Sequence, residues 1–150
     1  SQRGKGRIFN IFNYKNAKKA EGKWQEQALL DGNYKAAMCN GEVLMVKAVR
    51  KSDGKKTNVL LFSVPMDDKR NYVGIYYKEL ASPADYASPK CFTSGWKTFK
   101  VSNTDSAYST MEQMSNGHIG FFYEESHVKG GYQMVFCDYT LEQITGGEFK

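Results

Sequence analysis

The segment Ser106–Glu125, SAYSTMEQMSNGHIGFFYEE, decides how the rest of the chain is interpreted. Its centre, Ser115-Asn116-Gly117, predicts a turn, because Asn and Gly adopt positive φ angles at little cost. The residues on both sides of this turn are typical of strands, and those from Ile119 onward should point alternately to the two faces of a sheet. The segment therefore predicts a hairpin that brings Tyr108 and Glu124 toward the same end.

Tyr108 lies between the small residues Ala107 and Ser109, so its phenol has space around it. A tyrosine at the start of a strand is most often half-buried packing, and a glutamate at a strand end is most often solvated. The spacing of Tyr108 and Glu124 alone therefore decides nothing about function.

Short strands separated by turn signals recur along the whole chain. Asn40-Gly41 predicts a hairpin between residues 36–40 and 42–50. Residues 58–64, NVLLFSV, predict a continuous apolar strand that Pro65 ends. Further strands are expected at residues 7–14, 24–30, 72–79 and 132–138, with a hairpin loop at 126–131, an irregular insertion at 80–89 and a helical turn after Thr140. No helix longer than a turn or two is expected, so the chain is predicted to be all-β and built of antiparallel sheets.

The composition is that of a globular protein, since 41% of the 150 residues are hydrophobic and 14% are aromatic. No stretch approaches the roughly 18–20 apolar residues of a membrane span, so no span is expected. The net charge of +5 agrees with an anionic substrate or surface, but also with ordinary solubility. The lysines are scattered and no arginine-rich run is present, so nucleic acid is not expected as a partner.

Cysteine and histidine are sparse. Cys39, Cys91 and Cys137 do not make a disulfide framework and leave the cellular compartment undecided. His118 and His127 are too few and too separated for the spacing of zinc ligands. Neither a metal site nor a cofactor is therefore expected.

Motifs between residues 60 and 144 resemble those of the sialidase (neuraminidase) family. Residues 107–111, AYSTM, followed by residues 116–124, NGHIGFFYE, are similar to the family pattern A-Y-S-x-L … D/N-G-x-I-G-x-L-Y-E. Residues 135–144, VFCDYTLEQI, resemble the closing phrase of the family, hydrophobic residues followed by F-T-L-E-x-I. Residues 60–71, LLFSVPMDDKRN, are similar to the family phrase L-L-F-S-x-P…R.

The resemblance implies a fold of which this chain is one part. The sialidase catalytic domain is a six-bladed β-propeller far longer than this chain, and the resemblance covers nearly all of residues 1–150 but only the last third of the family. Residues 1–150 are therefore expected to form the last two to three blades of the propeller. This incomplete domain would need the N-terminal portion of the same enzyme, as a separate chain or segment. Gly22 and Trp24 are the remains of one Asp-box motif and Gly95 and Trp96 of another, and Trp24 is expected to be a packing residue.

The resemblance also implies an exo-α-sialidase, a glycoside hydrolase that releases terminal α-linked sialic acid from glycoconjugates with retention. Tyr108 corresponds to the nucleophile. A neutral phenol is not repelled by the carboxylate on the anomeric carbon, and sialidases are an exception among glycosidases in using tyrosine. Because the pKa of free tyrosine is about 10, a neighbouring glutamate has to act as its base, and that glutamate is expected in the N-terminal portion.

Arginines are implied as the ligands of the substrate carboxylate. Arg70 corresponds to one arm of a three-arginine clamp, for which the planar guanidinium is suited because it binds a carboxylate bidentately. Arg3 is the candidate for a second arm, and Arg50, the other possibility, is better interpreted as a charge at a blade edge. Glu124 corresponds to the residue that orients the first arginine of the family, which lies in the N-terminal portion.

Two other functions stay open. A non-catalytic carbohydrate-binding β domain would use Trp24 and Trp96 as sugar platforms and would bind a glycan by itself. A trans-sialidase would share the fold and the clamp but transfer the sugar to another acceptor. Sialylated glycans are the expected partners of the enzyme, and analogy with bacterial enzymes that meet host glycans implies an extracytoplasmic location: secreted, periplasmic or at the cell surface.

Overall fold

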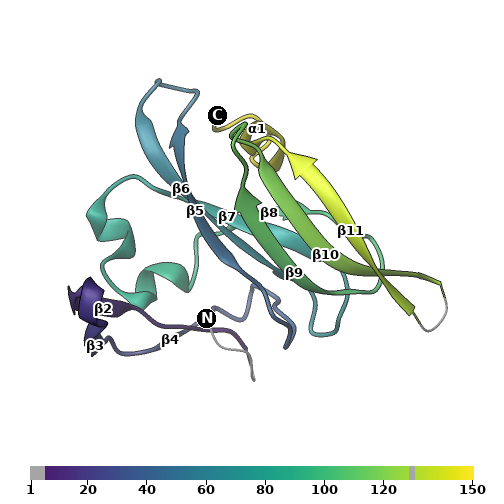
Figure 1. The fold of residues 1–150 in the computed structure, drawn as a ribbon, viewed down its shortest axis with the longest axis horizontal. Coiled ribbons are helices and arrows are strands. Elements are labelled where there is room, and N and C mark those ends of the chain that lie inside the picture. Colours follow the sequence, from purple (N-terminus) through teal and green to yellow (C-terminus); the bar gives the residue numbers. More distant parts are fainter. Residues whose placement is uncertain (1–5, 129–130) are drawn as a thin grey trace.

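The computed structural model describes residues 6–128 and 131–150, except for the side chains of His127 and Val128. The chain is mostly β and consists of several small antiparallel sheets (Figure 1). The strands are β1 (Ile8–Phe9), β2 (Phe12–Asn16), β3 (Glu21–Trp24), β4 (Ala28–Leu29), β5 (Val43–Val49), β6 (Lys56–Pro65), β7 (Val73–Leu80), β8 (Lys97–Lys100), β9 (Ser106–Gln113), β10 (Ile119–Val128) and β11 (Gly131–Tyr139). The helical turns are η1 (Ala17–Lys19), η2 (Pro83–Tyr86), η3 (Pro89–Phe92) and α1 (Leu141–Ile144). In the described part of the chain these sheets close into neither a barrel nor a propeller.

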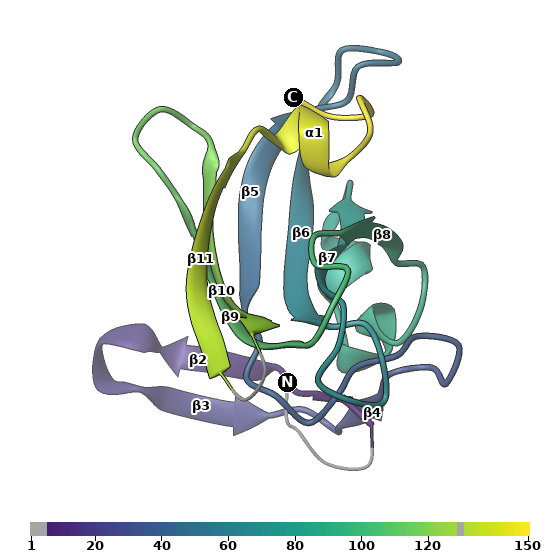
Figure 2. The same ribbon diagram turned by 90° about the vertical axis from the view of Figure 1, so that its right-hand side faces the viewer.

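The largest sheet has the strand order β5-β6-β7-β8. Its strand β6 is buried on both faces: Val59 and Leu61 pack into one hydrophobic cluster, and Leu60 and Phe62 pack into another. Figure 2 shows the β9–β11 sheet standing beside β5 and β6, where it covers the first of these faces. A strand covered on both sides has no face for polar side chains, which explains why the sequence of β6 is a continuous apolar run.

The predicted hairpin of β9 and β10 is confirmed. Gly117, in the turn, has a φ angle of 84°, which glycine adopts without strain. Along β10, Phe121 and Tyr123 are buried against the core, whereas Phe122 between them is 44% exposed. The hairpin loop predicted at residues 126–131 is shorter than expected, because β10 continues to Val128 and β11 begins at Gly131. Residues 129–130 lie outside the described residues.

The predicted helical turn after Thr140 is confirmed as α1. The Thr140 hydroxyl accepts a hydrogen bond of 3.1 Å from the backbone N–H of Gln143, and the Gln143 side chain accepts one of 2.8 Å from the backbone N–H of Thr140. This reciprocal cap satisfies N–H groups that a helix start leaves open. It seats Leu141 and Ile144 at the end of the core.

The N-terminal third differs from the prediction. Residues 7–14 form two short strands instead of one, because β1 pairs with β4 while β2 pairs with β3. Residues 36–40 form no strand, so of the hairpin predicted about Asn40-Gly41 only β5 exists. Here the buried Arg7 guanidinium donates hydrogen bonds to the carbonyls of Ala37 at 2.9 Å and Cys39 at 2.8 Å. In a sheet, these carbonyls would accept hydrogen bonds from the backbone of a neighbouring strand.

The two tryptophans have opposite environments. Trp96 is 6% exposed and packs into the cluster around Phe62, so the indole is part of the core. Trp24 is 69% exposed at the end of the β2–β3 hairpin. The prediction that Trp24 is a packing residue is therefore wrong. No helix among the described residues has the length and apolar character needed to cross a membrane.

The buried tyrosines predict a loss of stability at alkaline pH. Burial raises the pKa of Tyr76 to about 12. Burial also raises the pKa of Tyr123, and the hydrogen bond of its hydroxyl to Glu125 adds to this effect. Unfolded tyrosine titrates near pH 10, so this stabilisation is complete below about pH 10 and is lost as the pH rises toward about 12.

We expect the free energy of unfolding, measured by urea titration, to fall as the pH rises from about 10 toward about 12. The fall should be smaller in Tyr76→Phe, which has no phenol to ionise at this position, than in the matched exposed variant Tyr14→Phe. An equal fall in both variants would contradict the assignment to Tyr76.

Candidate functional site

Backbone hydrogen bonds join the loop between β6 and β7 to the start of β9. The N–H of Ser106 donates to the carbonyl of Arg70 at 2.8 Å, and the N–H of Tyr72 donates to the carbonyl of Thr104 at 3.0 Å. Tyr72 has a φ angle of 59°, a left-handed conformation that is rare outside glycine, and the ammonium of Lys100 lies 3.9 Å from the centre of its ring. The loop is thus fixed against the next sheet at the point where β9 begins.

The structure brings Arg70 and Tyr108 together. The Nη2 atom of Arg70 donates a hydrogen bond of 3.2 Å to the Tyr108 hydroxyl, and the guanidinium carbon lies 5.1 Å from the centre of the phenol ring. Arg70 is exposed and Tyr108 is half-buried, so solvent and ligands reach the pair. An arginine and a phenol oxygen therefore share one surface site.

An extra residue in β9 sets the position of Tyr108. Tyr123 pairs with Ser109, but Glu125 pairs with Ser106, so two residues of β9 face the single residue Glu124 of β10. The two residues are Ala107, which is fully buried, and Tyr108, which packs against the small cluster that contains Ala107. Such a bulge bends the strand locally and re-aims its side chains. The direction of the Tyr108 side chain is thus set by the bulge and not by the regular alternation of the strand.

Arg70 carries a positive charge that no described carboxylate neutralises. Among the described residues, its guanidinium is in ion-pair contact with neither an aspartate nor a glutamate. The thiol of Cys39 and the hydroxyls of Tyr108 and Tyr132 lie near it, and they raise the pKa of Arg70 above its ordinary value. An exposed guanidinium of this kind is suited to bind an anion from solution.

Of the other proposed site residues, Glu124 lies at the same end of the β9–β10 hairpin as Tyr108, as the predicted turn requires. Glu124 is half-buried opposite the bulge and makes no hydrogen bond to Arg70 or Tyr108. The buried carboxylate is that of the next residue, Glu125, which accepts a hydrogen bond of 2.9 Å from the Tyr123 hydroxyl. Residues 119, 121, 123 and 125 share one face of β10, so the alternation along the sequence could have predicted that the Glu125 side chain is buried. Arg3 lies outside the described residues.

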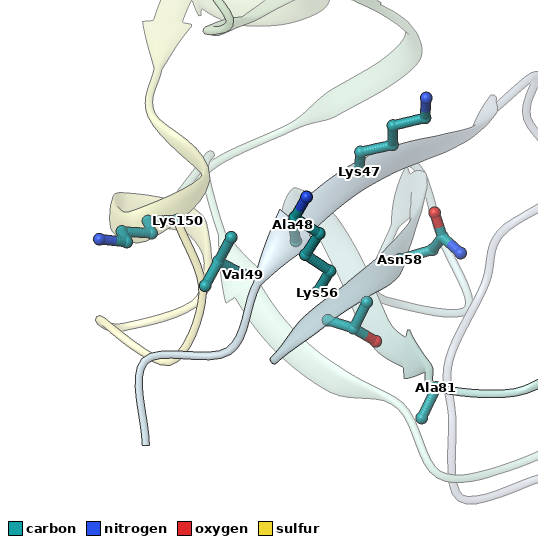
Figure 3. Close-up of a pocket in the computed structure, with 8 residues that line it drawn as sticks. Lys47, Ala48, Val49, Lys56, Asn58, Ala81 and Lys150 are labelled. Atoms are coloured by element: carbon teal, nitrogen blue, oxygen red, sulfur yellow. The ribbon is translucent and has the colours of Figure 1, made fainter. Parts of the chain in front are cut away.

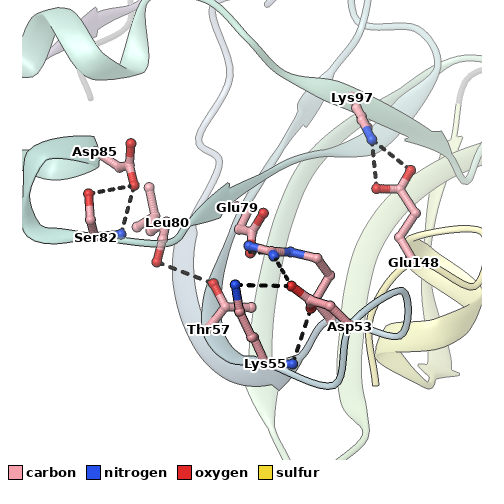
Figure 4. Close-up of polar contacts among 10 residues, drawn as sticks. Asp53, Lys55, Thr57, Glu79, Leu80, Ser82, Asp85, Lys97 and Glu148 are labelled. Carbon is pink, nitrogen blue, oxygen red and sulfur yellow. Dashed lines mark hydrogen bonds and ion pairs between the residues drawn. The ribbon is translucent and has the colours of Figure 1, made fainter.

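Arg50 is part of a surface charge network. Its guanidinium lies 2.7 Å from carboxylate oxygens of both Asp53 and Glu79. Figure 4 shows these two carboxylates, with the neighbouring pair of Lys97 and Glu148, whose charged atoms are 2.6 Å apart. The charge of Arg50 is thus neutralised within the chain, in agreement with its interpretation as a structural charge.

A pocket of about 560 Å³ lies on another part of the surface. It lies where β5 ends and β6 begins, and Lys47, Lys56 and Lys150 project around it (Figure 3). Arg70 follows the opposite end of β6, so this pocket and the Arg70–Tyr108 pair are separate.

No described group of histidine, cysteine, aspartate or glutamate side chains is arranged to hold a metal ion. A comparison with models of known protein families found no match, and a search of curated proteins found no significantly similar sequence. The assignment of a function therefore depends on the motifs quoted above and on the geometry of Arg70 and Tyr108.

Proposed function

We propose that this chain is the C-terminal part of the catalytic domain of an exo-α-sialidase, and that it supplies the last two to three blades of a six-bladed β-propeller. The observation that carries the proposal is the 3.2 Å contact between the Arg70 guanidinium and the Tyr108 hydroxyl. These are the two residues that the motifs assign to carboxylate binding and to nucleophilic attack. They are 38 positions apart in the sequence, and the fold brings them together.

The chemistry of sialic acid explains why these two groups should be neighbours. Its carboxylate is attached directly to the anomeric carbon, so a group that binds the carboxylate must lie next to the group that attacks that carbon. Arg70 would hold the carboxylate through charge-assisted hydrogen bonds. Tyr108 Oη would then be positioned for attack on the adjacent carbon.

In the proposed reaction, a bond forms between Tyr108 Oη and the anomeric carbon while the bond from that carbon to the leaving oxygen breaks. The phenol proton passes to a base, and the leaving oxygen takes a proton from an acid; both groups belong to the N-terminal portion. Water then displaces Tyr108 from the same carbon. Two displacements at one carbon give net retention.

An uncovered apolar face supports the view that more protein packs against this chain. Phe122, Met134 and Phe136 are 44%, 65% and 50% exposed, and they lie on one face of the paired strands β10 and β11. The rings of Phe122 and Phe136 are in contact, with centroids 4.6 Å apart. A contiguous apolar patch usually marks an interface, and the N-terminal portion of the propeller is the proposed occupant. In that assembly Glu124 would orient the first arginine of the clamp, and Arg3 would supply another arm.

The same site also fits a trans-sialidase, which differs only in the acceptor of the sugar. The carbohydrate-binding alternative retains one of its two platforms, because Trp24 is exposed while Trp96 is buried. Sialylated glycans outside the cytoplasm are the proposed substrates in both enzymatic cases.

The proposal is tested by measuring the intact mass and size of the purified protein, followed by assay with a fluorogenic sialoside. Hydrolysis by the chain together with its N-terminal portion, but not by this chain alone, is the expected result. A folded assembly of both parts that leaves the sialoside intact would overturn the proposal.

Replacement of Arg70 by alanine in the complete enzyme should mainly weaken substrate binding. Loss of hydrogen bonds to a charged group costs about 1.5–3 kcal/mol, so KM for the sialoside should rise roughly 10- to 100-fold. Arg70→Lys keeps the charge but loses the bidentate geometry, so it should give an intermediate KM. Because Arg70 is exposed, the thermal unfolding midpoint should stay close to that of the wild type. Unchanged kcat and KM in Arg70→Ala would remove Arg70 from the clamp.

A further inference from the structure

Trp24 borders a surface pocket of about 400 Å³ that the proposed reaction does not use. The other residues that line it are Asn10, Gln25 and Gln27. Its lining thus consists of one large aromatic ring and three neutral amide side chains. Among the described residues, no ionised side chain lines this pocket, in contrast to the pocket where β5 ends and β6 begins, which lysines surround.

The ring of Trp24 is held in place although it is exposed. Phe12 packs against it with ring centroids 5.0 Å apart and planes inclined by 68°. Phe12 also lies over Gly22, where a Cβ atom would come within 2.7 Å of the Phe12 ring and 2.2 Å of the Asn13 carbonyl oxygen. Glycine is therefore required at position 22 for the Phe12 ring to support the indole from within the β2–β3 hairpin.

One of the amides is also fixed. The Nε2 atom of Gln25 donates hydrogen bonds of 3.2 Å to the Asn13 side chain and 3.2 Å to the carbonyl of Ala87, which joins the hairpin to the segment after η2. These bonds use both hydrogens of the amide, and its oxygen accepts none from the described residues. Gln25 thus keeps one hydrogen-bond acceptor for a ligand.

We propose that this pocket, formed by Trp24, Asn10, Gln25 and Gln27, binds a neutral sugar. A pyranose ring presents a face of C–H groups that packs on an indole, and hydroxyl groups at its edge that exchange hydrogen bonds with amides. A charged ligand would find no opposite charge in the lining, and an aliphatic ligand would leave the amide groups without partners. The lining therefore matches a ligand that is apolar on one face and has neutral hydroxyls around it.

This sugar site is separate from the Arg70–Tyr108 pair. In Figure 1 the β2–β3 hairpin and the β9–β11 sheet lie at opposite ends of the longest axis of the molecule. A neutral-sugar site at the hairpin would retain the protein on a glycan while the other site acts on a terminal acidic sugar. The binding proposal goes beyond the sialidase proposal and does not depend on it.

The test is an NMR titration of the full chain with lactose, in which the two indole N–H resonances are followed. The Trp24 resonance should shift saturably with a dissociation constant on the order of 1 mM, as for a weak single-sugar contact. The Trp96 resonance is an internal control, because the Trp96 indole is buried and donates to the carbonyl of Phe92 at 2.8 Å. It should stay unchanged.

Two variants complete the experiment. Trp24→Ala should abolish the binding of lactose, as followed by the amide resonances of Gln25 and Gln27. Phe136→Ala removes an exposed aromatic ring from the β10–β11 pair, at a position outside the pocket, and should leave binding unchanged. If the wild-type Trp24 resonance does not respond to lactose, or if it responds equally to N-acetylneuraminic acid, the proposal is overturned. Neither readout involves hydrolysis of a sialoside, so failure here leaves the proposed enzymatic function untouched.

Discussion

If the proposed sialidase reaction holds, replacement of Tyr108 by phenylalanine in the complete enzyme should reduce the kcat for a sialoside by at least about 10⁴-fold, because it removes the atom that forms the covalent bond in that reaction. The affinity for the substrate should change little, since the ring of phenylalanine keeps the packing against Ala107 and the proposal assigns the carboxylate to the arginines. The measurements are steady-state kinetics and, for the inactive variant, calorimetric titration with the sialoside.

Tyr132→Phe is the matched control. Tyr132 is an exposed phenol close enough to Arg70 to affect its pKa, yet nothing assigns it the role of nucleophile. We expect this variant to retain at least about a tenth of the wild-type kcat, as for a residue outside the chemical step. A Tyr108→Phe enzyme with turnover close to that of Tyr132→Phe would eliminate Tyr108 as the nucleophile.

Replacement of Phe62 by alanine should be the most destabilising single change among those considered, at about 3–5 kcal/mol. Phe62 is fully buried in β6, and its ring contacts those of Phe9, Tyr76 and Trp96 at centroid distances of 5.6, 6.1 and 5.9 Å. Loss of the ring removes all three contacts and leaves a cavity beneath Trp96. Urea denaturation followed by tryptophan fluorescence measures the cost.

Phe136→Ala serves as the comparison, because Phe136 is 50% exposed on the uncovered face of the β10–β11 pair. In the chain alone, this variant should lose less than about 1 kcal/mol, as is usual for a surface substitution. If both phenylalanine variants lose similar stability, the assignment of Phe62 to the core is wrong.

The parts of the fold that sequence predicts well are those in which one local rule decides the structure. Asn116-Gly117 sets the β9–β10 turn, the apolar run of β6 ends at Pro65, and Thr140 caps α1. Each of these signals acts within a few residues and needs no knowledge of distant partners.

Segments 7–14 and 36–40 were predicted less well because contacts between distant residues decide their structure. The guanidinium of Arg7 binds the carbonyls of Ala37 and Cys39, more than 25 positions away, and so satisfies groups that a strand ladder would otherwise pair. Hydrophobic periodicity contains no information about such a side-chain contact. The same holds for the exposure of Trp24, which depends on how its hairpin is placed.

The candidate site shows the same division. Arg70 and Tyr108 were each selected from a motif, but their contact was not predicted, because no spacing rule gives a contact across 38 residues. The bulge opposite Glu124 was not predicted, because an extra residue in β9 does not change the alternation of buried and exposed residues along β10. The burial of Glu125, however, could have been predicted from the two-residue period of β10.

The left-handed backbone of Tyr72 has a consequence for how this protein can evolve. A non-glycine residue with a φ angle of 59° stores roughly 1–3 kcal/mol of strain, and glycine at the same position would release much of it. Yet the backbone N–H of Tyr72 donates a hydrogen bond to Thr104, two residues before β9, and Tyr72 lies two residues from Arg70, so relaxation there would also loosen the support of the Arg70–Tyr108 pair. Selection for thermal tolerance alone would therefore favour glycine at position 72, and selection for a well-ordered site would oppose it. As long as the site is used, we expect a non-glycine residue to be retained at position 72, together with the strain that lowers the stability of the fold.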